Sequence, residues 1–479
     1  MDDTSRTYDV IVIGAGPVGE NVADRTKAAG LSTVIVESEL LGGECSYWAC
    51  EPSKALLRPV LARADARRVP GLRKVVAGPL DVPAVLAHRD DIVFHWQDDD
   101  QVAWLNSVSV DIVRGHGRLD GPRQVVVTSS DGGTVRLIAR HVVAVCTGTR
   151  AALPDLPGLD EVRVWTSREA TSAAAVPGRL VVVGGGVVAV EMATAWRALG
   201  AEVTQLVRGE VLLPGREPFA GELVAEGLRE AGVDVRFATS VTSVARQDGP
   251  DGEVRVTLAD GEQLVADELL FAIGRAPRTD DLGLETIGLS PGDWLKADDT
   301  CRVGDVDDGW LYAVGDVNHR ALLTHQGKYQ ARIAGAVIGA RVNGEPLDET
   351  KWGAHVTTAD SEAVPQVVFS DPEVAHVGVT AQEAERAGRR IQVVDNDFLS
   401  VAGAVQYAED FRGKARMVVD LDRGTVVGVT FVGPGVAELL QSATVAVVGE
   451  VPVERLWHAV PPFPTISEVW LRLLEAYRG

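Results

Sequence analysis

The chain contains little cysteine and little positive charge. Only four of its 479 residues are cysteines, which excludes a disulfide-stapled scaffold. Lys and Arg total 46 against 68 Asp and Glu, so the net charge is −22. A chain this acidic lacks the basic footprint that favours nucleic acid or anionic lipid. We therefore expect neither nucleic acid nor membrane as a partner.

Long hydrophobic runs are also missing. No apolar stretch reaches the roughly 18 residues needed to span a bilayer. The first residues, MDDTSRTYDVIVIG, lead from an acidic cap into a β-type strand without a basic region or cleavage site, which predicts a cytoplasmic protein. Metal-type spacing of cysteines and histidines is absent, so no metal site is expected. At about 100–200 residues per domain, the length suggests roughly three domains.

Two stretches of the chain are nearly duplicates, residues 8–38 and 178–209, and each reads as strand, Gly-rich turn, helix and strand. This pattern predicts an α/β fold with two Rossmann-like dinucleotide-binding domains and parallel sheets. From about residue 350, strands followed by amphipathic helices predict a C-terminal α+β domain. The expected boundaries are 1–150 with 276–349 for the first domain, 151–275 for the second and 350–479 for the third.

The first duplicate carries a phosphate-binding motif. Gly14, Gly16 and Gly19 form G-x-G-x-x-G between strand and helix, which allows a tight turn and close approach of a pyrophosphate to the helix N-terminus. Glu37 ends the second strand, where its carboxylate can accept hydrogen bonds from both hydroxyls of an adenosine ribose. Together these features predict a dinucleotide site.

The second duplicate differs at the position of the acid. It carries Gly184, Gly186 and then Ala189, and Val207 stands where Glu37 stands in the first. Without a carboxylate, the site has no means of favouring a free 2′-hydroxyl, and the next residue, Arg208, could pair with a 2′-phosphate. We expect NADPH to be accepted. The alternative is that Arg208 is a solvated charge at the end of a strand.

Cys45 and Cys50 lie in GGECSYWACEPSK, shortly after Glu37. Five residues of regular helix advance about 7.5 Å, beyond disulfide reach, so pairing needs a distorted first turn. Their place beside a nucleotide site predicts a redox-active pair, with two structural thiols as the alternative. Cys146 and Cys301 are expected to be inert.

In combination and order, several motifs resemble the pyridine nucleotide-disulfide oxidoreductases, a flavoenzyme family that includes dihydrolipoamide dehydrogenase, glutathione reductase and mercuric reductase. The resemblance covers essentially the whole chain. The matching elements are the two glycine motifs, the C-x4-C-x-P-S-K stretch, Thr147-Gly148, Glu191, Gly274-Arg275, Gly315-Asp316, PQVVFSDPEVAHVG and PTISE.

The resemblance implies FAD in the first domain, NAD(P)H in the second and a homodimer formed by the C-terminal domain. It implies that Asp316 holds the FAD ribityl chain and that Lys54 and Glu191 lie near the flavin and the nicotinamide. Cys50 would face the flavin, and Cys45 would meet the substrate. A helix starting near His325, capped by Thr324, would point its positive end at the flavin. Further cofactor-binding residues implied are Gly43, Thr147, Gly148, Gly274, Arg275 and Gly315.

The chain also departs from the family. Phe463 occupies the position of the histidine that shuttles protons in the disulfide reductases, although its partner acid remains as Glu468. General acid–base help of this kind is worth roughly 10²–10⁴ in rate. Glu44 replaces a threonine beside Cys45, and a carboxylate there would disfavour the thiolate.

These departures favour an FAD-dependent NAD(P)H oxidoreductase that passes electrons to a small acceptor such as a quinone. The main alternative is a disulfide or dihydrolipoamide-type reductase that uses the Cys45–Cys50 pair. A mercuric reductase-like enzyme is a lesser alternative, because the extra C-terminal cysteine pair of that enzyme is missing. A flavin-binding component with an assembly role is the remaining hypothesis.

Overall fold

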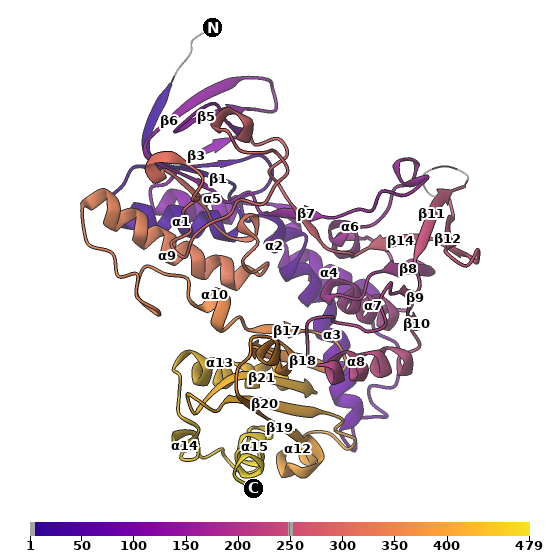
Figure 1. Ribbon diagram of the computed structural model, residues 1–479. Coiled ribbons are helices and arrows are strands. Elements are labelled where there is room, and N and C mark those ends of the chain that lie inside the picture. Colours follow the sequence, from indigo (N-terminus) through magenta and orange to yellow (C-terminus); the bar gives the residue numbers. More distant parts are fainter. Residues whose placement is uncertain (1–4, 248, 250–251) are drawn as a thin grey trace. The chain divides into compact units, whose positions relative to one another are not determined.

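The structure is a computed structural model that describes residues 5–247, 249 and 252–479. The chain divides into two compact units. The first comprises residues 1–52, 90–150 and 275–361, and the second comprises residues 53–89, 151–274 and 362–479. Figure 1 labels the elements of both units.

The first unit is built around a seven-stranded sheet with the order β3-β2-β1-β6-β5-β4, in which β16 also pairs with β6. Strands β3, β2, β1, β6 and β16 run parallel, whereas β4 and β5 are antiparallel. The bounds are β1 (Arg6–Ile13), β2 (Thr33–Glu37), β3 (Asp111–Arg114), β4 (His116–Leu119), β5 (Gln124–Thr128), β6 (Thr134–Val145) and β16 (Leu311–Ala313). Val10 and Val12 of β1 pack into one core and Ile11 and Ile13 into another. Burial on both faces explains why β1 is a continuous apolar run.

Two long helices of this unit, α1 (Pro17–Ala28) and α9 (Thr324–Asn343), lie side by side in Figure 1. Glycine on α9 allows their close approach, because a Cβ atom at Gly335 would lie 2.3 Å from the Cβ atom of Arg25. The approach fixes the position of α9 along α1. The shorter elements are α2 (Gly43–Tyr47), η1 (Phe94–Trp96), α5 (Asp99–Ser107), β7 (Thr149–Ala151), β15 (Arg275–Pro277), η3 (Leu284–Ile287), η4 (Asp307–Gly309), η5 (Asp316–Asn318) and α10 (Ala359–Glu362).

The second unit contains a four-stranded parallel sheet with the order β10-β9-β8-β14 and a three-stranded antiparallel sheet, β11-β12-β13. The strands are β8 (Arg179–Val183), β9 (Glu202–Leu206), β10 (Asp234–Arg236), β11 (Val241–Arg246), β12 (Val254–Leu258), β13 (Gln263–Ala266) and β14 (Glu268–Phe271). The helices are α3 (Cys50–Arg68) and α4 (Val82–Ile92), most of whose residues belong here, with η2 (Leu159–Glu161), α6 (Ser167–Ser172), α7 (Val187–Leu199) and α8 (Pro218–Glu230).

The C-terminal part of the second unit forms a five-stranded antiparallel sheet with the order β17-β18-β21-β20-β19. The strands are β17 (Gln366–Val368), β18 (Glu373–Gly378), β19 (Ile391–Asp397), β20 (Lys414–Asp420) and β21 (Thr425–Gly433). The helices are α11 (Ala381–Arg386), η6 (Phe398–Ser400), α12 (Ala402–Tyr407), η7 (Val436–Leu439), α13 (Leu440–Val448), α14 (Val453–Leu456), η8 (Ile466–Glu468) and α15 (Val469–Arg478).

These sheets confirm the predicted fold class. Each duplicated stretch forms parallel strands around a helix, and the antiparallel C-terminal sheet with its helices is the expected α+β arrangement. The limits of the three domains stay a prediction. Among the described residues, no helix combines the length and apolar character needed to cross a bilayer.

A buried histidine lies in the C-terminal sheet. His376 on β18 is opposite Thr430 on β21, and its Nδ1 is 2.9 Å from the Thr430 hydroxyl. Its Nε2 is 2.9 Å from the carbonyl oxygen of Gly378, which can only accept, so Nε2 donates. Burial, with Arg216 nearby, lowers the pKa of His376 to about 4.

The low pKa of His376 predicts a loss of stability in acid. The unfolded chain takes up a proton near pH 6.5 and the native state does so only near pH 4, so stability is retained above pH 6.5 and falls as the pH drops toward 4. At about 1.4 kcal/mol per pKa unit the full loss is about 3.5 kcal/mol below pH 4, of which about 2 kcal/mol is already lost at pH 5. Urea unfolding at pH 7 and pH 5 checks this, and His376→Gln should flatten the difference. An equal pH dependence in the variant would contradict it.

Candidate active site

The first glycine turn follows β1 directly. Gly14 has φ +98°, and a Cβ atom there would lie 2.5 Å from the carbonyl oxygen of Cys146. Glu37, at the end of β2, accepts hydrogen bonds from the backbone amides of Ala15 (2.7 Å) and Glu39 (2.8 Å). These bonds lock the carboxylate at the turn and leave it lone pairs for further donors. The predicted Gly14, Gly16, Gly19 and Glu37 are therefore brought together.

Buried polar atoms without partners surround this turn. The Thr147 hydroxyl and Oε1 of Glu20 are buried and have no hydrogen-bond partner among the described residues. Burial raises the pKa of Glu20, which lies in the first turn of α1, to about 8. Gly43 approaches Gly16 so closely that a Cβ atom at Gly43 would lie 2.8 Å from the Cα atom of Gly16. A narrow backbone cradle with unsatisfied polar atoms fits FAD.

Asp316 is held in a polar chain at the end of β16. Its Oδ2 accepts a hydrogen bond from the Thr149 hydroxyl (2.9 Å), which accepts one from Nε of Arg275 (2.5 Å). Burial raises the pKa of Asp316, and the Thr149 bond opposes this rise. The preceding Gly315 donates its amide to Oε1 of Gln330 (2.7 Å). The structure thus brings the predicted Arg275, Gly315 and Asp316 together.

Glu44 points to the same polar chain. Its carboxylate pairs with Nη2 of Arg278 at 2.8 Å, and Nε of Arg278 donates to the carbonyl oxygen of Thr149 (3.2 Å). The paired arginine offsets the charge that was expected to disfavour the Cys45 thiolate. The pKa of Cys45 is raised above its ordinary value by its hydrogen bond with Cys50 and by burial, and Glu51 adds a smaller rise.

Cys45 and Cys50 share one partner. The helical path is interrupted between them, because α2 ends at Tyr47, Trp48 has φ −138° and ψ 4°, and α3 begins at Cys50. The Thr324 hydroxyl is 3.1 Å from Sγ of Cys45 and 3.2 Å from Sγ of Cys50, and both cysteines are thiols. The helix is thus interrupted between the two cysteines, as a disulfide between residues five apart would need, and their redox role stays a prediction.

The role of Thr324 was predicted wrongly. It was expected to cap the helix, but the N-cap of α9 is Leu323, and no side chain caps the helix. Thr324 is the first residue of α9, and its hydroxyl contacts the two thiols. His325 follows in the first turn with an exposed side chain. The thiols therefore lie at the positive end of a 20-residue helix, whose field opposes the rise in the pKa of Cys45 that Cys50 and burial cause.

The second glycine turn repeats the first. Gly184 has φ +143°, and a Cβ atom there would lie 2.2 Å from the carbonyl oxygen of Ala272. Gly186 is the N-cap of α7, and Ala189 packs against Gly184. Gln205 is buried, and its Oε1 has no partner among the described residues. This backbone cradle with an unsatisfied amide oxygen fits a second dinucleotide.

The residues predicted to distinguish the two nicotinamide nucleotides lie past β9. Val207, at the position of the acid, is buried and lies beside Gly185, where a Cβ atom would be 2.8 Å from Cγ1 of Val207. Arg208 is exposed. An exposed guanidinium is compatible with both hypotheses for Arg208, namely that it pairs with a 2′-phosphate and that it is a solvated charge.

Lys54 and Glu191 form an ion pair in the second unit. Nζ of Lys54 is 2.7 Å from Oε2 of Glu191, whose side chain is only 4% exposed. Oε1 of Glu191 accepts the backbone amide of Phe369 (3.1 Å), and Nζ of Lys54 lies 5.0 Å from the centre of the Phe369 ring. The predicted pair is thus fixed by the residue that follows β17.

The C-terminal residues differ in exposure. The Phe463 side chain is 75% exposed, whereas Glu468 is buried. Oε1 of Glu468 pairs with Nη2 of Arg472 (2.5 Å), and Oε2 is buried with no partner among the described residues. The acid therefore keeps an unused acceptor, and the residue at the histidine position is apolar.

Some residues of the site were not predicted. Thr149 and Arg278 join Glu44 to Asp316, and Gln330 holds Gly315. Thr149 and Arg278 lie two and three residues beyond the quoted Thr147 and Arg275, so proximity to a motif was the available signal. Within the described ranges, no group of three or more His, Cys, Asp or Glu side chains could hold a metal ion.

Relatives of known function match almost the whole chain. Dihydrolipoyl dehydrogenase 3 of Pseudomonas aeruginosa is 33% identical over 469 residues, 96% of either chain. The dihydrolipoyl dehydrogenase of Haloferax volcanii is 31% identical over 489 residues, covering 100% of this chain and 98% of that one. That of Rhizobium etli is 30% identical over 498 residues, covering 99% and 98%.

Solved structures share the fold. LpdA from Mycobacterium tuberculosis superposes with a TM-score of 0.82 at 26% identity, covering 97% of this chain and 99% of that one. A Cu(II) complex of the HOCl-induced flavoprotein disulfide reductase RclA from Escherichia coli gives 0.83 at 23% identity, covering 98% and 99%. Residues 8–335 match the family described as pyridine nucleotide-disulphide oxidoreductase, and residues 364–473 match its dimerisation domain. The chain belongs to the pyridine nucleotide-disulphide oxidoreductase family, whose members are FAD-containing enzymes that use NAD(H).

Proposed function

We propose that the protein is an NAD(P)H-dependent disulfide reductase of the dihydrolipoamide type, in which electrons leave through Cys45 and Cys50. The observation that carries this proposal is the Thr324 hydroxyl, which lies within 3.2 Å of both thiols. The relatives named dihydrolipoyl dehydrogenase support it at 30–33% identity over nearly their full length. These relatives favour a disulfide reductase over a quinone reductase, which was the function favoured by the departures of this sequence from the family pattern.

The hydrogen bonds give the two thiols different roles. Thr324 donates its one hydroxyl proton to Cys45, so the S–H of Cys50 is left to donate to the Thr324 oxygen. Cys45 is then the sulfur that accepts a hydrogen bond, and as a thiolate it attacks a substrate disulfide, while the proton that leaves its S–H group is taken up by the sulfur that departs. Attack forms a mixed disulfide and releases one thiolate. Cys50 then attacks Cys45, which releases the second thiol and leaves a Cys45–Cys50 disulfide.

The cofactors are held by the two glycine turns. FAD supplies the transfer of electrons between nicotinamide and disulfide when it is bound. Glu37, Thr147 and Asp316 would hold it in the first unit, and Arg275 orients Asp316 through Thr149. In the second unit, Gly184, Gly186, Ala189 and Arg208 would hold the nicotinamide dinucleotide, with the Lys54–Glu191 pair as the polar group nearby in that unit.

We retain the three-domain assignment as part of this proposal, with 1–150 and 276–349 for FAD, 151–275 for NAD(P)H and 350–479 for dimerisation. The first and second sheets support the first two assignments. The match of residues 364–473 to the dimerisation domain supports a homodimer. A small-molecule acceptor and a cytoplasmic location belong to the same proposal.

A second candidate function is direct transfer of electrons to a small acceptor such as a quinone. Phe463 favours it, because phenylalanine cannot carry the proton that thiol chemistry needs, whereas transfer from the flavin needs no histidine at that position. The mercuric reductase-like alternative has no comparable support, because no cysteine follows Cys301 in the sequence.

Replacing one cysteine separates the two functions. Cys50→Ser should abolish NADPH-dependent reduction of lipoamide while reduction of menadione by the same preparation continues, since only the first needs the pair. In anaerobic titrations, the wild-type protein should take up two equivalents of NADPH and the variant one. Menadione activity serves as the internal control for an intact flavin site. Retention of full lipoamide activity in the variant would rule out the disulfide relay.

Restoring a histidine tests the missing base. Phe463→His should raise the kcat for lipoamide about 10- to 100-fold, because general acid–base catalysis contributes roughly 10²–10⁴ and the rest of the pocket is unadapted. Menadione reduction should stay unchanged. Phe463→Tyr is the matched control, being of similar size without a base near neutral pH. An equal gain in both variants, or no gain in the histidine variant, would show that the lack of a base at position 463 does not limit the rate of lipoamide reduction.

The coenzyme preference can be checked at Arg208. Arg208→Ala should raise KM for NADPH about tenfold, the loss expected for one charge-assisted hydrogen bond, and leave KM for NADH nearly unchanged. Steady-state kinetics with menadione measure both constants. If Arg208 is only a solvated charge, KM for NADPH and KM for NADH should each be the same in the variant and in the wild-type protein.

A further inference from the structure

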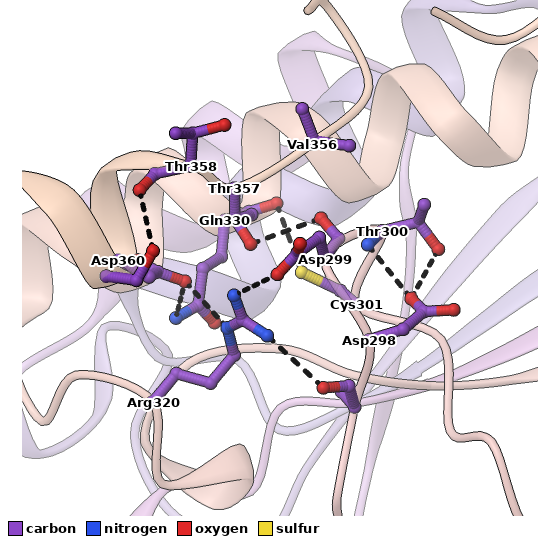
Figure 2. A network of polar contacts seen from close by, with 12 residues as sticks. Asp298, Asp299, Thr300, Cys301, Arg320, Gln330, Val356, Thr357, Thr358 and Asp360 are labelled. Atoms are coloured by element: carbon purple, nitrogen blue, oxygen red, sulfur yellow. Dashed lines mark hydrogen bonds and ion pairs between the residues drawn. The ribbon is translucent and has the colours of Figure 1, made fainter. Parts of the chain in front are cut away.

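A segment of chain after α9 is bound to the core of the first unit. This segment, residues 344–361, we call the strap. Thr357 of the strap donates its amide (2.8 Å) and its hydroxyl (3.1 Å) to the carbonyl oxygen of Asp299. The Tyr329 hydroxyl of α9 donates to the carbonyl oxygen of Val356 (3.2 Å). Figure 2 shows this region from close by, with the strap residues beside Gln330 and Arg320.

Near the end of the strap, the Asp360 carboxylate accepts three hydrogen bonds. They come from Nε2 of Gln326 (3.0 Å), Nε2 of Gln330 (2.9 Å) and Nε of Arg320 (3.1 Å). The Asp360 side chain is only 1% exposed. A buried carboxylate is costly unless donors compensate it, and these three donors supply that compensation. Figure 2 shows Arg320 reaching both Asp360 and Asp299.

Gln330 connects this cluster to the turn after β16. Its Oε1 accepts from the amide of Gly315 (2.7 Å) and from Nδ2 of Asn318 (2.8 Å). Both partners are donors, so Oε1 must face them and Nε2 must face Asp360. Asp360 can only accept when ionised, and it therefore fixes the orientation of the Gln330 amide. One continuous set of hydrogen bonds runs from the strap to Gly315.

We propose that Asp360 is a positioning residue for the Gly315–Asp316 turn, and that through Gln330 it sets the affinity and the reduction potential of bound FAD. The inference rests on the proposed function, in which Asp316 holds FAD. Losing the carboxylate removes the acceptor that holds Nε2 of Gln330, so the amide that accepts from Gly315 is anchored on one side only and holds the Gly315 amide less firmly. The bond that fixes the backbone of the turn is thereby weakened, and Asp316 moves with it.

The first test compares two carboxylates that bind the same arginine. Asp360→Asn should weaken FAD binding to the apoprotein about tenfold, the effect of losing one charge-assisted buried hydrogen bond. It should also shift the midpoint potential of the bound flavin. Asp299→Asn is the matched control, because Asp299 pairs with Arg320 through a 64% exposed side chain that makes no bond to Gln330. The control should change FAD affinity by less than about twofold.

Rescue distinguishes positioning from general stability. Gln330→Glu alone places a second carboxylate against Asp360 and should weaken FAD binding as Asp360→Asn does. When the two substitutions are combined, the introduced asparagine can donate its amide to the introduced glutamate, whose carboxylate still accepts from Gly315. FAD affinity and midpoint potential should then return toward the wild-type values. If the double variant binds FAD no more tightly than the single variants, the proposal is overturned. This comparison also decides the matter if Asp360→Asn alone yields no folded protein.

A further variant separates this inference from the proposed function. Asp316→Asn should weaken FAD binding if Asp316 holds the flavin. If Asp316→Asn leaves the affinity and potential at wild-type values, the proposed flavin site is wrong. If Asp316→Asn weakens binding and Asp360→Asn does not, the positioning role of Asp360 is overturned and the flavin site stands.

Discussion

The register of the parallel strands fixes where the chemistry of the first unit takes place. Ile13 at the end of β1 pairs with Val36 of β2 and with Val145 of β6, and Val145 pairs with Ala313 of β16. The carboxyl ends of these strands therefore lie at one level. The residues that follow them meet at one edge of the sheet, namely Gly14, Glu37, Thr147 and Gly315. Slipping any of these strands would take one of these groups out of the site.

Local patterns were enough to predict the parts of the site that lie within one strand-turn-helix unit. The glycine turns and Glu37 follow from motif spacing, whereas the Lys54–Glu191 pair joins distant segments and was given only by the family resemblance. The interpretation was wrong at Thr324. The local sequence suggested a helix cap, but in the structure the Thr324 hydroxyl contacts cysteines that are far away in the sequence. The pairing of Glu44 with Arg278 and of Asp360 with Gln330 joins distant segments, and nothing in the local sequence marks either partner.

The two units differ in what they offer the proposed thiol chemistry. In the first unit, Thr324 and the start of α9 provide a hydrogen-bond partner and a favourable field for the thiols. In the second unit, an apolar Phe463 stands at the position of the family's base, and Glu468 pairs with Arg472. Under the proposed function, a thiol relay without this base suits a substrate thiol that is acidic enough to leave unaided.

The glycine contact between α1 and α9 has a consequence for how the protein tolerates mutation. Gly335 lies eleven residues after Thr324, which is about 16 Å along a helix, yet any side chain there must push α9 away from Arg25. Because a helix moves as a rigid rod, that displacement reaches Thr324 and the thiols it contacts. In a screen of random variants, some of the most damaging positions should therefore lie on the surface of contact between two helices, remote from every reacting atom.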